Sequence, residues 1–349
     1  MLLNKFKGAM IGGLIGDCLG ATFEMKTMNM IPERKVQSFL DDVKNMAEDE
    51  AEHEAFEYTD DTAMARQISK SFLDQKKIDC KHLAQCFTEE YFHEPWRGYG
   101  GSVVEVFKKL RDSKCEEPFR PAAEQFSGSG SYGNGAGMRA HPVALACYND
   151  DSAELIDVAR DVARLTHSHH LGVTGGIVQS LAVFNALHAD TALDNLKKVK
   201  TVVNELEKEM NEDTPSLYKH KIDLVEKHVD CSDDDLAEVM FELGNEVSAV
   251  DSVPTAFFCY LKISQDSSIP DHDKLEAVLK LAVRAGGDTD TIASMACSIA
   301  GADLGLDNIP THLYKHCEAA TETLDMAEQM FNIVTSKSEE PESKKQRTD

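Results

Sequence analysis

The sequence predicts an all-α protein. Apolar residues recur with helical spacing over 62–75, 82–92 and 101–111, and again over 153–165 and 173–187. Alternating runs of β-branched residues, which would indicate strands, are few. A chain of 349 residues suits either two domains or one large helical domain, because length alone is a weak guide. We therefore expect helices throughout, and composition leaves the number of domains open.

The charge balance excludes several kinds of partner. Lys and Arg number 36 against 61 Asp and Glu, which gives a formal net charge of −25. Such a surface repels the phosphates of nucleic acid and the headgroups of anionic membranes. We therefore expect neither direct binding to duplex nucleic acid nor binding to a membrane, and an anionic substrate would need locally placed binding groups.

The cysteines and the two ends of the chain bear on its compartment. The nine Cys contain no C-x-x-C pair, and a chain of this length does not need disulfides, so we expect buried thiols in a reducing compartment. Residues 1–21 resemble a signal peptide, but Asp17 interrupts a short apolar run. Basic residues at 344–347 resemble a weak nuclear-import signal. We expect an intracellular protein of the nucleus and cytoplasm, with the mitochondrial matrix as an alternative.

The first predicted helix covers residues 6–20 and is rich in glycine. Glycine costs a helix about 1 kcal/mol per residue, so close packing against a neighbouring helix should offset this cost. Asp17 in such an apolar helix should need a polar partner, and Gly20 should end the helix. An irregular segment follows, and the acidic residues 41–57 should form a solvated loop or a short helix.

The segment 126–139 is the most glycine-dense part of the chain. It contains G-x-G-x-x-G at Gly128, Gly130 and Gly133 and leads into a predicted helix near Met138. No strand precedes it, so the pattern does not indicate a dinucleotide-binding βαβ unit. Backbone N–H groups clustered near a helix start can bind phosphate, and a plain flexible loop is the alternative.

Three histidines follow the helix predicted over 153–165. His167, His169 and His170 fall within four residues, which would suit zinc, but no further ligand is spaced to complete such a site. We expect this turn to face a substrate or solvent.

The last part of the chain should also be helical. A charged helical hairpin is predicted over 193–227, broken near 214–215, and another helix over 234–261, kinked or restarted at Pro254. Helices over 275–283 and from 292 to Gly301 follow. The residues from 336 to 349 are charged and aperiodic, so we expect a globular region over 1–335 and a disordered tail.

Two of the predicted helix starts offer paired carboxylates beside threonine hydroxyls. Oxygen ligands without Cys suit hard cations such as Mg²⁺, Mn²⁺ or Ca²⁺, although Thr or Asp at a helix start is often only a cap. If the two starts face each other, a two-metal site follows. The two sequences are Thr59-Asp60-Asp61-Thr62 and Asp288-Thr289-Asp290-Thr291.

An ordered set of motifs resembles the ADP-ribosylglycohydrolase family, in the branch similar to poly(ADP-ribose) and serine-ADP-ribose hydrolases. The resemblance covers nearly the whole chain. It implies a single compact orthogonal helical domain with a binuclear metal cleft and two Mg²⁺ ions, with Mn²⁺ as an alternative. The motifs lie at 12–24, 58–62, 97–100, 130–139, 165–167 and 286–291.

The resemblance also implies a role for individual residues. Glu24 would approach the second metal from a mobile loop and act as an acid/base or position water, and Asp60 and Asp290 would be catalytic as well as metal ligands. The other implied metal ligands are Thr59, Asp61, Asp288 and Thr291. The implied substrate contacts are Gly130, Ser131 and neighbouring backbone including Gly133 for the diphosphate, Phe126 and Tyr132 for adenine, and Gly98 and His167 for the distal ribose.

The implied activity is Mg²⁺-dependent hydrolysis of the O-glycosidic bond of ADP-ribose on serine and in poly(ADP-ribose), releasing free ADP-ribose. The partners would be ADP-ribosylated proteins and poly(ADP-ribose), with a role in the DNA damage response, and we expect a monomer. One alternative is an arginine-specific hydrolase. Others are a catalytically silent ADP-ribose reader and a structural metal-binding protein. The full set of carboxylates argues against a reader, which would be expected to have lost one.

Overall fold

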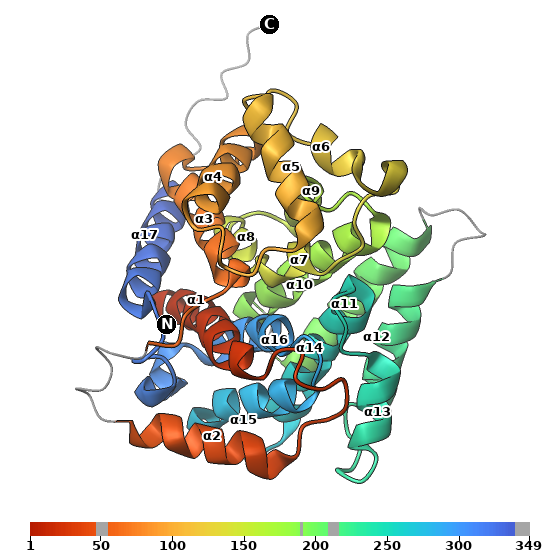
Figure 1. Cartoon of the computed structure of the whole chain (residues 1–349). Helices are drawn as coiled ribbons and strands as arrows, with labels where there is room; N and C mark the ends of the chain where they lie inside the picture. Colours follow the sequence, from red (N-terminus) through yellow and green to blue (C-terminus); the bar gives the residue numbers. More distant parts are fainter. Residues whose placement is uncertain (47–54, 189–190, 209–215, 339–349) are drawn as a thin grey trace, which may run out of the picture.

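Two helices from opposite ends of the chain, α1 (Leu2–Gly20) and α16 (Thr289–Leu304), lie side by side at the centre of the molecule (Figure 1). Their backbones touch. A Cβ atom added at Gly12 would lie 2.1 Å from a backbone atom of α16, and at Gly8 and Gly16 the separation would be 2.2 Å. The predicted close helix approach in this glycine-rich segment is therefore confirmed, because only a residue without a side chain fits there.

The computed structural model describes residues 1–46, 55–188, 191–208 and 216–338. Within these ranges the elements are helices and loops without a β-strand, which confirms the predicted all-α fold in one domain. The helices besides α1 and α16 are α2 (Glu33–Asn45), α3 (Asp60–Gln75), α4 (Cys80–His93), α5 (Gly101–Asp112), α6 (Arg120–Ala123), α7 (Gly135–Met138), α8 (His141–Ala146), α9 (Ser152–Arg164), α10 (His170–His188), α11 (Ala192–Lys208), α12 (Leu217–His228), α13 (Leu236–Leu243), α14 (Ala249–Gln265), α15 (Asp271–Arg284) and α17 (Ala320–Ser338).

The other helices surround this central pair. α14, α15 and α10 pack against α16, α17 packs against α1, and α2 covers the outer side of α15 (Figure 1). Helices α3, α4 and α5 form a separate group that joins the centre where α3 meets α1 and α8. One connected cluster of buried apolar residues runs through all these helices. The cleft described below lies where the α3 group meets the central pair.

Helix α10 is the one described helix that is long and apolar enough to cross a bilayer. Most of its residues are buried inside the protein, where it packs against α9, α7 and α16. Its composition is therefore accounted for by its place in the core.

The cysteines were predicted to be buried thiols. All nine are free thiols, and all but Cys80 and Cys231 are buried.

Helix α2 occupies a segment that was expected to be irregular, so that expectation was wrong. Val36, Leu40 and Val43 recur with helical spacing and are buried, and they form the apolar face that holds α2 on the protein. The acidic segment 41–57 begins inside this helix, and most of the rest of it, 47–54, lies outside the described residues.

The predicted helix over 234–261 is two helices, and the break is not at Pro254. The chain leaves α13 at Gly244, whose φ of +88° is in the left-handed region that favours glycine. Pro254 lies inside α14 without interrupting it. Helices α11 and α12 confirm the predicted hairpin, but its break near 214–215 lies outside the described residues.

The end of the globular region differs slightly from the expected boundary at 335. Helix α17 continues to Ser338, so the first residues of the expected tail are helical. Residues 339–349 lie outside the described residues, and their disorder stays a prediction.

The close contact between α1 and α16 predicts that a methyl group added on α1 destabilises the protein. We expect Gly12→Ala to lower the free energy of unfolding by about 1–3 kcal/mol or more, because the new Cβ meets rigid backbone. Gly101→Ala is the control, since nothing lies within 4 Å of a Cβ added at the start of α5. It should be neutral or slightly stabilising. Urea unfolding measures both, and equal stability of the two variants would contradict the account.

Candidate metal and substrate site

The acidic starts of α3 and α16 open into one cleft of about 430 Å³. The predicted metal ligands that line it are Glu24, Asp60, Asp61, Asp288, Asp290 and Thr291. The predicted substrate contacts that line it are Gly98, Phe126, Ser131, Tyr132, Gly133 and His167. The fold thus brings together groups that are far apart in the sequence, whereas Thr59 and Gly130 lie outside this lining.

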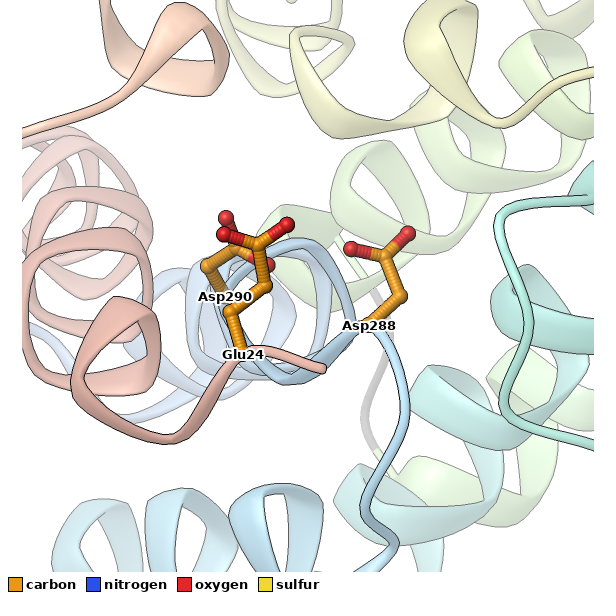
Figure 2. A group of neighbouring side chains, drawn as sticks. All are labelled: Glu24, Asp288 and Asp290. Atoms are coloured by element: carbon orange, nitrogen blue, oxygen red, sulfur yellow. The ribbon is translucent and has the colours of Figure 1, made fainter. Parts of the chain in front are cut away.

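Three carboxylates in this cleft form a compact group. One oxygen atom each from Glu24, Asp288 and Asp290 lies within 4.8 Å of the others. Figure 2 shows that their carboxylates point to the same side, with Glu24 on the segment after α1, Asp290 on α16 and Asp288 on the loop just before it. A single cation could contact all three side chains.

The second helix start adds further oxygen atoms. Asp61 is buried, and its Oδ1 accepts a hydrogen bond from the hydroxyl of Thr291 (3.3 Å). Its Oδ2 and the Oδ1 of Asp290 have no partner, although both atoms are buried. Buried carboxylate oxygens without a partner are costly, and a hard divalent cation would satisfy them. The residues present therefore fit a metal such as Mg²⁺.

Burial and mutual repulsion raise the pKa of these acids. Burial, followed by the charges of Asp17 and Asp288, raises the pKa of Asp60 to about 8. The same causes, burial first, hold the pKa of Asp61 and of Asp290 well above the usual range for aspartate. Glu24 is exposed at the rim, but partial loss of hydration and the charge of Asp288 raise the pKa of its carboxyl group. The cluster is thus an unfavourable place for several negative charges unless a cation is bound.

Asp17 has the polar partners that its sequence position demanded. Its carboxylate, fully buried, accepts hydrogen bonds from the N–H groups of Thr59 (3.1 Å) and Thr62 (3.0 Å) and from the hydroxyl of Thr59 (2.9 Å). The hydroxyl of Thr59 also caps α3 by accepting from the N–H of Asp61 (3.3 Å). Asp17 therefore fixes the start of α3 to α1. Thr59 serves as a cap here, and its role as a metal ligand stays a prediction.

The segment that carries Glu24 is bonded to the loop that carries Asp288. The N–H of Met25 donates to the carbonyl of Gly287 (2.9 Å), and the N–H of Gly287 donates to the carbonyl of Thr27 (2.8 Å). Gly287 has a φ of +67°, and a Cβ there would lie 2.1 Å from the carbonyl oxygen of Asn245. This crowding explains why glycine precedes Asp288.

Two residues of the glycine-rich loop that line the cleft have backbone N–H groups without a protein acceptor in the described part of the chain. Among the described residues, no protein acceptor receives the backbone N–H of Ser131 or of Tyr132. Gly130 has a φ of +74°, and a Cβ added there would lie 2.2 Å from Oγ of Ser168. The loop can therefore bind an anion through Ser131 and its neighbours, while Gly130 shapes the turn behind them.

Two aromatic rings stand at the mouth of the cleft. Phe126 and Tyr132 line it and remain 57% and 55% exposed, far more than aromatic residues of the core. Phe126 has a φ of +50°, an unusual value for a bulky residue, and such strain is common at binding sites. Their roles in adenine stacking stay predictions, as do the contacts of Gly98 and His167 with ribose.

His169 and His170 lie beside each other, half-buried, with ring centroids 4.2 Å apart.

Sequence reasoning did not single out Asn134 as a site residue. Its side-chain amide donates to Oδ2 of Asp288 (2.6 Å), and its backbone N–H donates to the carbonyl of Val247 (2.9 Å). Asn134 therefore orients Asp288 from the glycine-rich loop. Its position within that loop was the available signal, but its partner is 154 residues away in the chain.

Comparison with known proteins agrees with this geometry. The family model described as ADP-ribosylglycohydrolase matches residues 1–340. The chain is 38% identical over 346 residues to the ADP-ribosylhydrolase ARH3 of Homo sapiens, with 95% of this chain and 94% of the relative covered. It is 37% identical over 345 residues to the ADP-ribosylhydrolase ARH3 of Danio rerio, with 95% and 91% covered.

A solved structure described as an ADP-ribosylglycohydrolase-related protein complex has the same fold, with a TM-score of 0.68 at 21% identity. The match covers 95% of this chain and 98% of that one. The fold and the two close relatives agree with the family model, which spans nearly the whole chain. The chain therefore belongs to the ADP-ribosylglycohydrolase family of enzymes.

Proposed function

We propose that this glycohydrolase uses two Mg²⁺ ions to cleave the O-glycosidic bond that joins ADP-ribose to serine and to the next unit in poly(ADP-ribose). The observation that carries the proposal is the meeting of the α3 and α16 carboxylates in one cleft, which is also lined by loop residues whose backbone N–H groups have no protein acceptor within the described ranges. ADP-ribosylhydrolase activity itself follows from the family and from relatives at about 37% identity. The proposal adds to this activity the identity of the metal, Mg²⁺, and the type of glycosidic bond that is cleaved.

The donor set supports Mg²⁺. The ligands would be Asp60, Asp61, Asp288, Asp290 and Thr291, with Glu24 at the rim and Thr59 beside them. All offer hard oxygen atoms, and no Cys or His lies among them. When bound, the ions would neutralise these carboxylates and polarise the oxygen atoms that they contact.

The glycine-rich loop would hold the diphosphate of the substrate. The backbone N–H groups of Ser131 and Tyr132 would donate hydrogen bonds to the phosphate oxygens. An anionic substrate needs such local donors, because the net charge of the protein is −25. The rings of Phe126 and Tyr132 at the mouth would cover the adenine. In this proposed pose the far ribose would lie beside the carboxylates of Glu24, Asp288 and Asp290.

Glu24 is the proposed proton carrier. Partial burial, the largest cause, raises the pKa of its carboxyl group, and a general acid/base works best when its pKa lies near the operating pH. It would accept a proton from the attacking water and return one to the departing serine oxygen. The bond between ribose C1″ and that oxygen breaks, and free ADP-ribose and serine form.

The proposed partners are ADP-ribosylated proteins and poly(ADP-ribose), bound by a monomer in the nucleus and cytoplasm. The family supports ADP-ribosylated substrates. The linkage, the oligomeric state and the compartment rest on the sequence resemblance.

The first prediction concerns Glu24. We expect Glu24→Gln to lower kcat by about 10²–10⁴-fold, the range for loss of a general acid/base, while ADP-ribose still binds. The matched control is Glu322→Gln on α17, an exposed glutamate away from the cleft. Release of ADP-ribose from a modified peptide gives kcat, and calorimetry gives the Kd. Unchanged kcat with weakened binding would instead make Glu24 a substrate clamp.

The second prediction concerns the linkage. With matched seryl- and arginyl-ADP-ribosylated peptides at equal concentration and with Mg²⁺ present, the seryl peptide should lose ADP-ribose faster. A serine oxygen is a poor leaving group that gains from protonation by Glu24, whereas the arginine guanidinium is already cationic.

Faster cleavage of the arginyl peptide would move the protein to arginine linkages and leave the fold and the metal site standing. Binding of both peptides without release of ADP-ribose, even with Mg²⁺, would favour a reader that has no catalytic activity.

A further inference from the structure

A buried chain of hydrogen bonds leads from Arg139 to the cleft. The Nη2 of Arg139 donates to the hydroxyl of Thr166 (2.8 Å), and that hydroxyl lies 2.7 Å from Nδ1 of His167. Arg139 and Thr166 are completely buried, and His167 is 8% exposed, where it lines the cleft. Water therefore has little access to any of these groups.

The directions of these hydrogen bonds follow from the chemistry of the groups. A guanidinium can only donate, so the hydroxyl of Thr166 must accept from Arg139. Its own proton still needs an acceptor, and His167 Nδ1 is the one acceptor within reach among the described residues. A buried hydroxyl proton without an acceptor is costly. Nδ1 of His167 must therefore carry a lone pair, which leaves the ring proton on Nε2.

We propose that Arg139 and Thr166 are positioning residues that hold His167 as the neutral Nε2–H tautomer, so that Nε2–H donates a hydrogen bond to an oxygen atom of the ADP-ribosyl group in the cleft. The ligand in this inference rests on the proposed function. The tautomer does not, because it is a property of the ligand-free protein.

The glycine-rich loop fixes the same ring from the other side. A Cβ added at Gly135 would lie 2.6 Å from Cε1 and 3.0 Å from Nε2 of His167, and one at Gly133 would lie 3.4 Å from Nε2. The Nε2 edge therefore faces the loop that also carries Ser131. A ring held from both sides cannot flip to exchange its two nitrogen atoms.

The charged form of His167 is also disfavoured. Burial, and then the charge of Arg139, lowers the pKa of His167 to about 3. A protonated ring would have to donate from Nδ1 and would lose the hydrogen bond from Thr166. His167 is thus a fixed donor at neutral pH and not a general acid or base, which leaves proton transfer to Glu24 on the carboxylate side.

The tautomer can be observed directly. In the ligand-free protein, ¹⁵N NMR of the His167 ring should show a protonated Nε2 and an unprotonated Nδ1. Thr166→Val removes the donor to Nδ1 and should abolish this preference, whereas Thr166→Ser keeps the hydroxyl and should retain it. Thr88→Val is the matched control, because Thr88 is also a buried threonine with a hydrogen-bonded hydroxyl, which donates to the carbonyl of Ala84 on α4, away from the cleft.

Binding and kinetic measurements test whether Nε2–H of His167 donates a hydrogen bond to the ADP-ribosyl group. Thr166→Val should weaken ADP-ribose binding about tenfold and Thr166→Ser by no more than about twofold, because one hydrogen bond is lost or kept. KM should rise with kcat nearly unchanged in Thr166→Val, as expected for a contact made equally in the ground and transition states. Thr88→Val should change neither, and the melting temperature of each variant shows whether it is folded.

A protonated Nδ1 in the unaltered protein would overturn the proposal. So would a Thr166→Val variant that keeps both the Nε2–H form and the original affinity. An Nε2–H tautomer in a protein that does not bind ADP-ribose would overturn the ligand assignment together with the proposed function, and would leave only the tautomer standing.

Discussion

The backbone contact between α1 and α16 is the constraint on which the rest of the structure depends. At its far end, a Cβ at Gly20 would lie 2.7 Å from the Cα of Asp290, and the hydroxyl of Thr289 donates to the carbonyl of Gly20 (2.9 Å). The end of α1 is thereby fixed against the start of α16. The segment that follows α1 carries Glu24, so the same contact that packs the core also sets the distance between Glu24 and the aspartates of α16.

Asp17 extends this control to the third part of the site. From the last turn of α1 its carboxylate accepts hydrogen bonds from the N–H groups at the start of α3, and α3 carries Asp60 and Asp61. Asp60, Asp61 and Asp290 therefore lie on helices that are packed against one another, which limits how far these acids can move apart to relieve repulsion. A site of this kind is held ready for a cation, at the expense of the stability of the metal-free protein.

Much of the fold and part of the site followed from local pattern. The glycine spacing in 6–20 predicted a close helix contact, and the two carboxylate pairs at helix starts predicted the cluster, because each signal lies within a few residues. Contacts between residues far apart in the chain could not be predicted from the sequence. Asn134 orients Asp288 across the fold, and Asn245 crowds Gly287, which no local pattern reveals. Helix α2 was missed because its apolar face is only three residues, diluted among charged ones. Thr59 shows the limit of motif reading, since a ligand and a cap look the same in sequence.

The most direct test of this account is the stability of the protein against pH with and without Mg²⁺. Asp60 has its pKa raised from 3.8 to about 8, so the folded metal-free protein binds more protons than the unfolded chain in that interval. Its contribution to stability is present below about pH 4 and is lost as the pH rises through about 8.

Chelator-treated protein should thus lose stability over this range, and Mg²⁺ at a hundredfold excess over its Kd should restore about 2.7 kcal/mol near pH 8. Asp290→Asn should weaken this rescue. A free energy of unfolding that Mg²⁺ leaves unchanged at pH 8, with K⁺ at equal ionic strength as the reference, would contradict the metal cluster on which the account rests.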